Sequence, residues 1–397
     1  MGAIWSSENP SSSGASDLEQ PPEPESPNYP RCYGDVVPSV CSNRPEDCYD
    51  ELYQKMYYVQ HTNHQDCIVA FQACEKDNPR VEPEEWFELV ERIPRVYEYL
   101  AHRNADTSII TLDVNVDVDT PIDVHPRIVK YLGRLPVGYL LEKLDPGPLI
   151  ATTRPLLSTF PKDFPNKDIL EIEPLLLLYY RWTLQSLTLL TYLHSHSVYL
   201  MDLSISTIWL RGDLSIALSG FVNATIPTDE FPYSPDGTRY EPEIYFPTTP
   251  RGHPELTPKI DLSDWATFVW QLMRWDRDGN QEGKRWAWPT DPLEEMDGEE
   301  KEQEKVNPWG FHTQRLKEGR FQLLEEERLG SILVKAWKGG YESASEIVEE
   351  VRSYLQRIGV RMDGEDEVLL DNGRKWEDVF EVVKTDGVRW EREIRYR

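Results

Sequence analysis

The residue of this chain that is best suited to chemistry is Asp202. It lies within residues 192–222, where a polar stretch separates the end of an apolar segment from two short apolar runs. This order predicts a helix end, a loop that carries one acidic side chain, and two short strands. A carboxylate in such a loop could accept the proton of a substrate hydroxyl. It could also cap the backbone amides of its own loop, and the pattern alone leaves both roles open.

The sequence lacks the motifs of several other chemistries. It has no G-x-x-x-x-G-K-S/T phosphate loop, no G-x-S-x-G nucleophile turn and no H-E-x-x-H zinc helix. His194 and His196 stand two residues apart at the expected helix end, where surface or packing roles are commoner than metal binding. Asp202 therefore remains the main candidate for a catalytic group.

Composition limits the partners and the compartment. The chain has 397 residues, of which 39% are hydrophobic, and this is enough for one large bilobal domain or two domains. The formal net charge of −28 argues against nucleic acid as a partner, because phosphates require a basic surface. The five cysteines lack C-x-x-C spacing, which favours free thiols in a reducing compartment, cytoplasmic or nuclear.

Membrane attachment is not expected from the sequence. No apolar run reaches the roughly 18 residues of a membrane-spanning helix, and the N-terminus lacks the basic and apolar regions of a signal peptide. Gly2 lies in an M-G-x-x-x-S pattern that matches N-myristoylation, but no nearby cysteine or polybasic run supplies a second anchor.

Hydrophobic periodicity predicts the elements that must position Asp202. In the first half we expect a buried strand at 67–73, a helix at 83–101 that Pro94 kinks or splits, a half-exposed ribbon at 108–124, and two strands with a turn within 125–149. In the second half we expect helices at 173–196 and 259–274, two more within 323–358 around Gly339–Gly340, a solvated loop at 291–306, and strands in the tail 360–397.

Residues 192–222 also resemble the catalytic loop and metal-binding segment of eukaryotic protein kinases, whose pattern is H-R-D-L-x-x-x-N followed by D-F-G. Five further segments resemble kinase landmarks in the correct order: His125–Gly133 before a strand of the first lobe, Leu140–Leu144 at the adenine-binding hinge, Tyr240–Glu243 at A-P-E, Lys259–Leu262 at the central helix, and Ala336–Ala344 near the C-terminus. The last segment and the Asp-Leu-Ser loop resemble a divergent group of kinase-like proteins in filamentous fungi.

This resemblance implies an α+β fold with two lobes, the first rich in strands and the second mainly helical. It covers about residues 34–358 and implies an N-lobe at 31–145, a C-lobe at 146–358 and an extension at 359–397. Residues 1–30 are rich in Ser, Pro and Glu with few apolar residues, and this composition predicts a disordered tail. The resemblance also implies a structural role for Asp261, whose kinase counterpart anchors the backbone of the catalytic loop. Leu200, Tyr97 and Phe221 match the apolar column that links the two kinase lobes.

Most of the chemical groups of the kinase pattern are replaced. Asp202 matches the catalytic aspartate, but Thr207 and Gly220 stand where the two magnesium ligands belong. Gln72 stands at the phosphate-binding lysine, and Ile93 near the glutamate that pairs with it. No glycine occurs between Gly34 and Gly133, so the first lobe has no glycine-rich loop. The adenine would meet only the degenerate hinge positions Leu141, Glu142 and Leu144.

The resemblance therefore implies a pseudokinase, a binding or scaffolding module for protein partners, with no cofactor expected and Asp202 as a relic. The alternative is an atypical Ser/Thr kinase that uses Asp202 as its base and requires ATP and magnesium. In that case Asp213 or the pair Asp229–Glu230 would have to hold the metal. A small-molecule kinase of the aminoglycoside or choline type would need H-x-D-x-x-x-x-N and a later paired-Asp motif, and both are absent.

Overall fold

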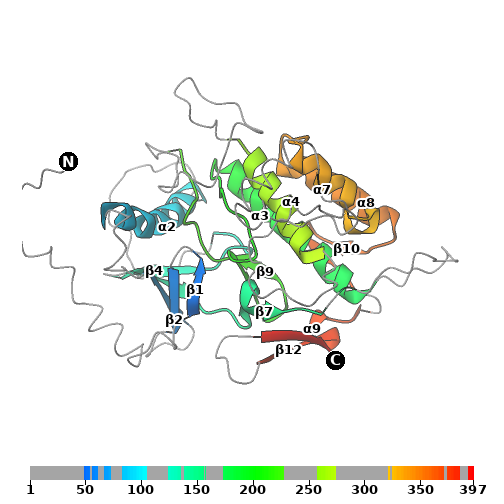
Figure 1. The fold of residues 1–397 in the computed structure, drawn as a ribbon, viewed down its shortest axis with the longest axis horizontal. Coiled ribbons are helices and arrows are strands. Elements are labelled where there is room, and N and C mark those ends of the chain that lie inside the picture. Colours follow the sequence, from blue (N-terminus) through cyan, green and yellow to red (C-terminus); the bar gives the residue numbers. More distant parts are fainter. Residues whose placement is uncertain are drawn as a thin grey trace, which may run out of the picture.

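The computed structural model describes residues 49–53, 56–60, 67–72, 83–104, 124–135, 138–155, 157, 173–227, 257–273, 321, 324–370, 373–384 and 392–397. These residues form a mixed α/β structure of helices and small, mainly antiparallel sheets (Figure 1). The expected tail at 1–30, the loop at 291–306, the segment Tyr240–Glu243, and nearly all of the ribbon at 108–124 lie outside the described residues.

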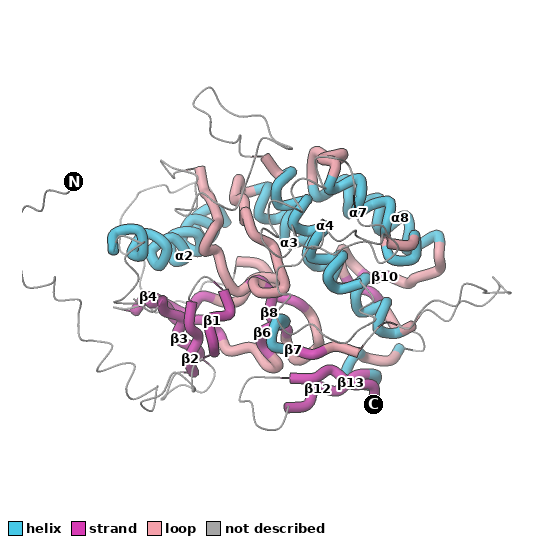
Figure 2. The backbone as a smooth tube through the Cα atoms, viewed as in Figure 1, coloured by secondary structure: helices cyan, strands magenta, loops and turns pink. Residues whose placement is uncertain are grey.

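The first part of the chain forms a five-stranded antiparallel sheet beside one long helix (Figure 2). The strands lie in the order β1-β2-β3-β5-β4. Their bounds are β1 Tyr49–Tyr53, β2 Met56–Gln60, β3 Cys67–Gln72, β4 Tyr131–Leu135 and β5 Gly138–Glu142. Ile68 and Ala70 alternate along β3 with their side chains fully buried, as expected for a strand with one face against the core.

The long helix is α2, Pro83–Asn104, and it runs through Pro94 as one element. The expected split at this proline is therefore wrong. A proline inside a helix removes one backbone hydrogen bond and costs about 3 kcal/mol or more. The residues around it compensate, because Ile93, Val96 and Leu100 are all fully buried. Tertiary packing of this face outweighs the local preference of the proline.

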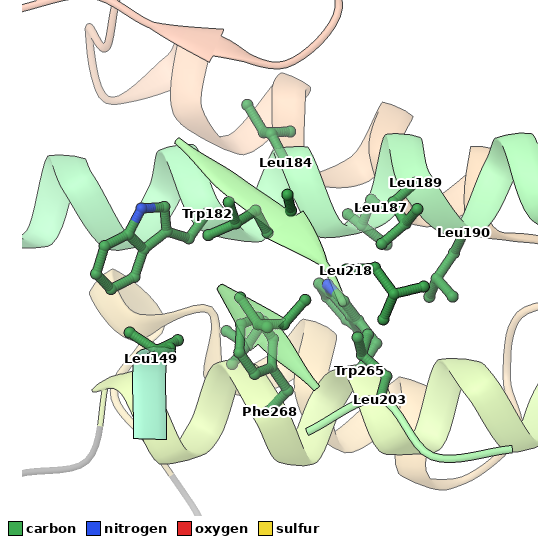
Figure 3. Packing of buried hydrophobic residues seen from close by; sticks show 14 of the residues in the cluster. Leu149, Trp182, Leu184, Leu187, Leu189, Leu190, Leu203, Leu218, Trp265 and Phe268 are labelled. Carbon is green, nitrogen blue, oxygen red and sulfur yellow. The ribbon is translucent and has the colours of Figure 1, made fainter. Parts of the chain in front are cut away.

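The helical part of the molecule is built on α3, Pro174–Ser195, whose side chains from Leu175 to Leu190 are all buried. It contacts α4, Lys259–Met273, and α8, Ala344–Arg357. Figure 3 shows the core between α3 and α4, to which Trp182 and Leu187 of α3 and Trp265 and Phe268 of α4 contribute side chains. These helices match the predicted ones at 173–196 and 259–274 closely.

Short elements complete this part of the molecule. The remaining helices are α7 Gly330–Trp337, α9 Trp376–Val379 and the short 3-10 turns η2 Leu149–Ala151 and η4 Glu326–Arg328. The remaining strands are β6 Gly147–Pro148, β7 Thr152–Thr153, β8 Ile208–Leu210, β9 Ile216–Leu218, β10 Met362–Asp363, β11 Glu367–Val368, β12 Phe380–Lys384 and β13 Arg392–Tyr396. The strands expected in the tail are present as two hairpins, and β13 also pairs in parallel with β7.

Gly330 begins α7 at a point where another segment of backbone passes very close. A Cβ atom added to Gly330 would lie 1.9 Å from the carbonyl oxygen of Leu324. No side chain fits at this distance without a shift of the backbone. Glycine is therefore required here by space.

We expect Gly330→Ala to destabilise the fold by about 1–3 kcal/mol, the usual range for overpacking a tight site. The measurement is the midpoint of unfolding in denaturant. Gly212→Ala is the matched control, because its added Cβ would lie at an ordinary 3.7 Å from its nearest neighbour, the oxygen of Asp145. Equal midpoints for the two variants would contradict the close approach.

His125 stands at the start of the segment that leads into β4. Its ring stacks on Tyr192 of α3 with centroids 4.6 Å apart, and its Nδ1 accepts a hydrogen bond from the Arg127 amide at 3.1 Å. The pKa of His125 is lowered from 6.5 to about 4, mainly by burial; the charge of Asp366 opposes this shift, and Arg127 and His196 contribute to it. The folded chain thus holds this imidazole neutral.

This lowered pKa predicts a pH dependence of stability. Between pH 6.5 and about 4 the unfolded chain binds a proton that the folded chain excludes at His125. The contribution of His125 is therefore complete above pH 6.5 and is lost as the pH falls towards about 4. Unfolding midpoints measured across this interval should fall less steeply in His125→Asn, which keeps a hydrogen-bond acceptor but does not titrate. Identical slopes in the variant and the parent chain would refute the assignment.

Candidate functional site

Asp202 lies in the loop between α3 and β8, and its side chain is half-buried. The Nδ2 group of Asn223 donates a hydrogen bond to its Oδ2 at 3.2 Å. Asn223 follows β9 and is only 3% exposed. This asparagine was missed by the sequence analysis, because the contact joins residues 21 positions apart. The one available signal was an amide side chain three residues after Gly220, beyond the end of β9.

The backbone next to Asp202 is held by Asp261 of α4. The Leu200 amide donates to Asp261 Oδ2 at 3.0 Å, and the Met201 amide donates to Oδ1 at 2.7 Å. His194 Nε2 lies 2.8 Å from Oδ2, so this nitrogen carries the hydrogen and donates it. Asp261 is 0% exposed. A buried carboxylate requires such donors on both oxygens, and these hydrogen bonds supply them.

The hydrogen bonds to Asp261 also hold Met201, a residue with a strained backbone. Met201 has a φ of 60°, in the left-handed region where a side chain other than glycine costs about 1–2 kcal/mol. Its amide is the one that donates to Asp261 Oδ1. The turn at Met201 sets the direction in which the chain continues to Asp202. The position of Asp202 therefore depends on a carboxylate about 60 residues later in the chain.

Thr207 uses its hydroxyl within the loop. The hydroxyl accepts the Ser204 amide at 3.1 Å and donates to the Ser204 carbonyl oxygen at 3.0 Å. The backbone oxygen of Thr207 accepts both the amide and the hydroxyl of Ser219, the residue before Gly220. Thr207 and Gly220, which the kinase resemblance places at the magnesium ligands, thus lie close together. The Thr207 hydroxyl bonds to the backbone of its own loop, and Gly220 has no side chain.

No cluster of three or more His, Cys, Asp or Glu side chains that could hold a metal ion occurs among the described residues. Asp213, one of the carboxylates considered for magnesium, instead binds Arg181 of α3 through Oδ2 at 3.2 Å. Burial alone would raise the pKa of Asp213, but hydrogen bonds from Ser215 and the charge of Arg181 bring it below its ordinary value. Asp229 and Glu230 lie outside the described residues.

The positions that match the adenine-binding hinge are mostly covered. Leu141 is 0% exposed and Leu144 is 5% exposed. Glu142 is half-buried, and its Oε1 accepts the Lys130 amide at 2.9 Å and Arg211 Nη2 at 2.8 Å. This side chain therefore ties β5 to the segment before β4 and to the loop after β8.

Gln72 is the remaining candidate among the positions that match the nucleotide site. Gln72 ends β3, where it pairs with Met56 of β2, beyond the stretch of β3 that pairs with β5. Trp209 of β8 is fully buried and pairs with Pro148 of β6 and Ala217 of β9. The sequence analysis gave Trp209 no specific role, since tryptophan in a short apolar strand usually indicates only core.

The expected apolar column is partly visible. Tyr97 of α2 and Phe221 meet edge to face with ring centroids 5.1 Å apart. Tyr97 also stacks on Tyr131 of β4 and donates its hydroxyl to the Val129 oxygen at 2.9 Å. Leu200 is buried in the same core cluster. These contacts join α2, β4 and the segment after β9 without any ligand.

Neither a protein-family model nor a curated protein matches this chain. Within the described residues, no helix combines the length and the apolar character that crossing a membrane requires, and this includes the apolar α3. The assignment of a role to the Asp202 loop therefore depends on its geometry.

Removal of the Asp261 carboxylate should destabilise the chain strongly. Asp261→Ala leaves the Leu200 and Met201 amides buried without an acceptor, and such a loss typically costs about 3–5 kcal/mol. Asp261→Asn should also destabilise it, because an amide accepts through one oxygen only. Chemical denaturation is the measurement, and Glu349→Gln, an exposed carboxylate on helix α8, is the control. Asp213 is unsuitable as a control because of its contact with Arg181.

If the Asp261 variants unfold at the same denaturant concentration as Glu349→Gln, the anchoring role is wrong.

Proposed function

We propose that this chain is a divergent protein-kinase-like protein with a bilobal fold, and that it acts as a binding or scaffolding module rather than as an enzyme. Residues 31–145 would form the strand-rich lobe, 146–358 the helical lobe and 359–397 an extension. The order of elements supports this proposal: a five-stranded sheet with one long helix precedes a helical part built on α3 and α4. Mixed architecture alone is common to many folds, so the loop carries more weight.

The observation that carries the proposal is the way in which the Asp202 loop is held. Asp261 anchors the loop backbone at Leu200 and Met201, as the kinase resemblance implies for this aspartate. A fold that retains this anchor retains the frame of a phosphoryl-transfer site. The frame supports a kinase-like ancestry, while the side chains on it decide whether catalysis is possible.

Phosphoryl transfer depends on positive charge around the phosphates, supplied by a lysine and magnesium ions. Position 72 carries a neutral glutamine, position 220 has no side chain, and the Thr207 hydroxyl ties its own loop. The Asp202 carboxylate accepts a hydrogen bond from Asn223. Position 72 thus lacks a charge, position 220 lacks a side chain, and the side chains of Thr207 and Asp202 make hydrogen bonds within the protein. These contacts favour a structural role for Asp202.

The hinge positions favour the same conclusion. Leu141 and Leu144 stand at the positions that would meet an adenine, and both side chains are buried against the rest of the core. Their burial supports a packing role at these positions. A surface of the protein, rather than this interior, would then bind its protein partners.

The alternative remains an atypical Ser/Thr kinase in which Asp202 is the base. One observation favours it: the Asp202 side chain is only half-buried, in a loop whose backbone is rigidly held. This alternative requires ATP and magnesium, and it requires metal ligands outside the described residues.

We expect no magnesium-dependent thermal shift of the full chain with millimolar ATP, and no transfer of phosphate to generic protein substrates. Each charge-assisted phosphate contact is worth about 1.5–3 kcal/mol, so the loss of several places the affinity outside the micromolar range. Thermal shift with and without magnesium, and a radiolabelled-phosphate transfer assay, are the measurements. Asp202→Asn is the matched variant, since it keeps the size of the side chain.

Transfer activity that is abolished in Asp202→Asn would overturn the pseudokinase proposal and establish the alternative. Activity that is equal in the two proteins would arise from a contaminant or another site, and would leave no role for this loop.

A further inference from the structure

The C-terminal residues 361–397, here called the C-terminal strap, return to the middle of the molecule and make buried ionic contacts there. Figure 1 shows β10 near α8, and Figure 2 shows the hairpin of β12 and β13 beside β7, with β13 as the strand next to β7. Between β10 and β11, the Asp366 carboxylate accepts two hydrogen bonds from Arg127, from Nε at 2.8 Å and from Nη2 at 2.9 Å. The Thr188 hydroxyl of α3 donates to the same carboxylate at 2.8 Å. One side chain of the strap thus holds two distant segments together.

The next residue continues this contact into α3. Glu367 lies 2.8 Å from Arg181 Nε, and Gln185 Nε2 lies 3.4 Å from its second oxygen. Trp376 of α9 donates its indole N–H to Glu367 at 3.3 Å and lies under the Arg181 guanidinium. The strap is therefore fastened along one side of α3 by charges and by an aromatic ring.

Arg127 lies at the junction between the five-stranded sheet and the rest of the molecule. It belongs to the segment 125–130, which connects directly to β4. This segment pairs with β9: the Val129 amide donates to the Leu218 oxygen and the Leu218 amide donates to the Arg127 oxygen, both at 2.9 Å. The segment is thus the place where the sheet, β9 and α3 meet.

The strap also contacts the chain that follows β5 and leads from the sheet to the helical part. There β13 pairs with β7, with Arg392 opposite Thr152. The buried Arg392 guanidinium lies 3.9 Å from the carboxylate of Asp145, the residue after Leu144. The strap therefore contacts both the segment 125–130 before β4 and the chain that follows β5.

We infer that the C-terminal strap is an internal brace that fixes the junction segment 125–130 against α3, so that the sheet and the helical part keep one arrangement. The Arg127 and Asp366 side chains are only 12% and 17% exposed, so solvent screens their attraction little. Although burial raises the pKa of Asp366, hydrogen bonds from Arg127 and Thr188 and nearby positive charge hold it below its ordinary value. The carboxylate is thus charged at neutral pH, as the brace requires.

The test is hydrogen exchange of the full chain, with Asp366→Asn as the variant and Asp363→Asn as its control. Asp363 is an exposed carboxylate of β10 in the same hairpin. We expect Asp366→Asn to speed exchange at Val129 and Leu218 by about tenfold or more, and Asp363→Asn to leave it unchanged. Faster exchange restricted to residues 361–370 would show that the strap only covers the surface, and would overturn the inference.

A second measurement uses the unmodified chain and therefore does not depend on whether a variant folds. In the unmodified chain, exchange at increasing, sub-denaturing concentrations of denaturant reports which amides open together. If the strap is a brace, the Leu369 amide, which bonds to the Arg361 oxygen, opens together with Val129 and Leu218. Opening of Leu369 well before those two amides, with their protection unchanged, would contradict the brace.

Discussion

The Asp261 carboxylate is the contact on which the rest of this molecule depends. It belongs to α4 and is buried in the core near the end of α3. Its oxygens accept hydrogen bonds from two backbone amides and from His194, which replace the hydrogen bonds of water. Removing one partner of such a buried charge costs more than the contact contributes, because the other partner stays without water. The loop, the strained Met201 and the side chain of Asp202 are all positioned through it.

The hydrogen bonds between Asp261 and the loop backbone do not depend on whether the loop is catalytic. They position the loop whether or not it carries catalytic groups, which is compatible with the binding module that we propose. The contacts of Thr207, Asn223 and Glu142 fit this proposal, since each uses a polar side chain to join segments of backbone or loop. In a site that retained catalysis, such groups would be directed towards a ligand.

The sequence predicted the elements with strong periodicity and missed those decided by tertiary contact. The helices at 174–195 and 259–273 were predicted nearly to the residue, because long apolar segments with clear ends depend little on their surroundings. The helix split that was one of the expectations for Pro94 does not occur, since the local cost of the proline is outweighed by burial of the same helix face.

For the site, the anchoring hydrogen bonds of Asp261 could be expected from a resemblance of motifs, but the Asn223 contact could not. The contact between Asp366 and Arg127 likewise joins residues 239 positions apart, and nothing in either local sequence indicates it. The strands of the tail were predicted from composition, whereas their parallel pairing with β7 depends on where the chain returns in space.

We proposed that the Asp202 loop keeps the backbone frame of a phosphoryl-transfer site without the side chains that bind metal and phosphate. This proposal is tested most directly by the electron paramagnetic resonance spectrum of Mn²⁺, used in place of magnesium, with ATP and the full chain. The proposal predicts that adding the chain leaves the spectrum of the free Mn²⁺–ATP complex unchanged. A protein-bound spectrum that disappears in Asp202→Asn would contradict it.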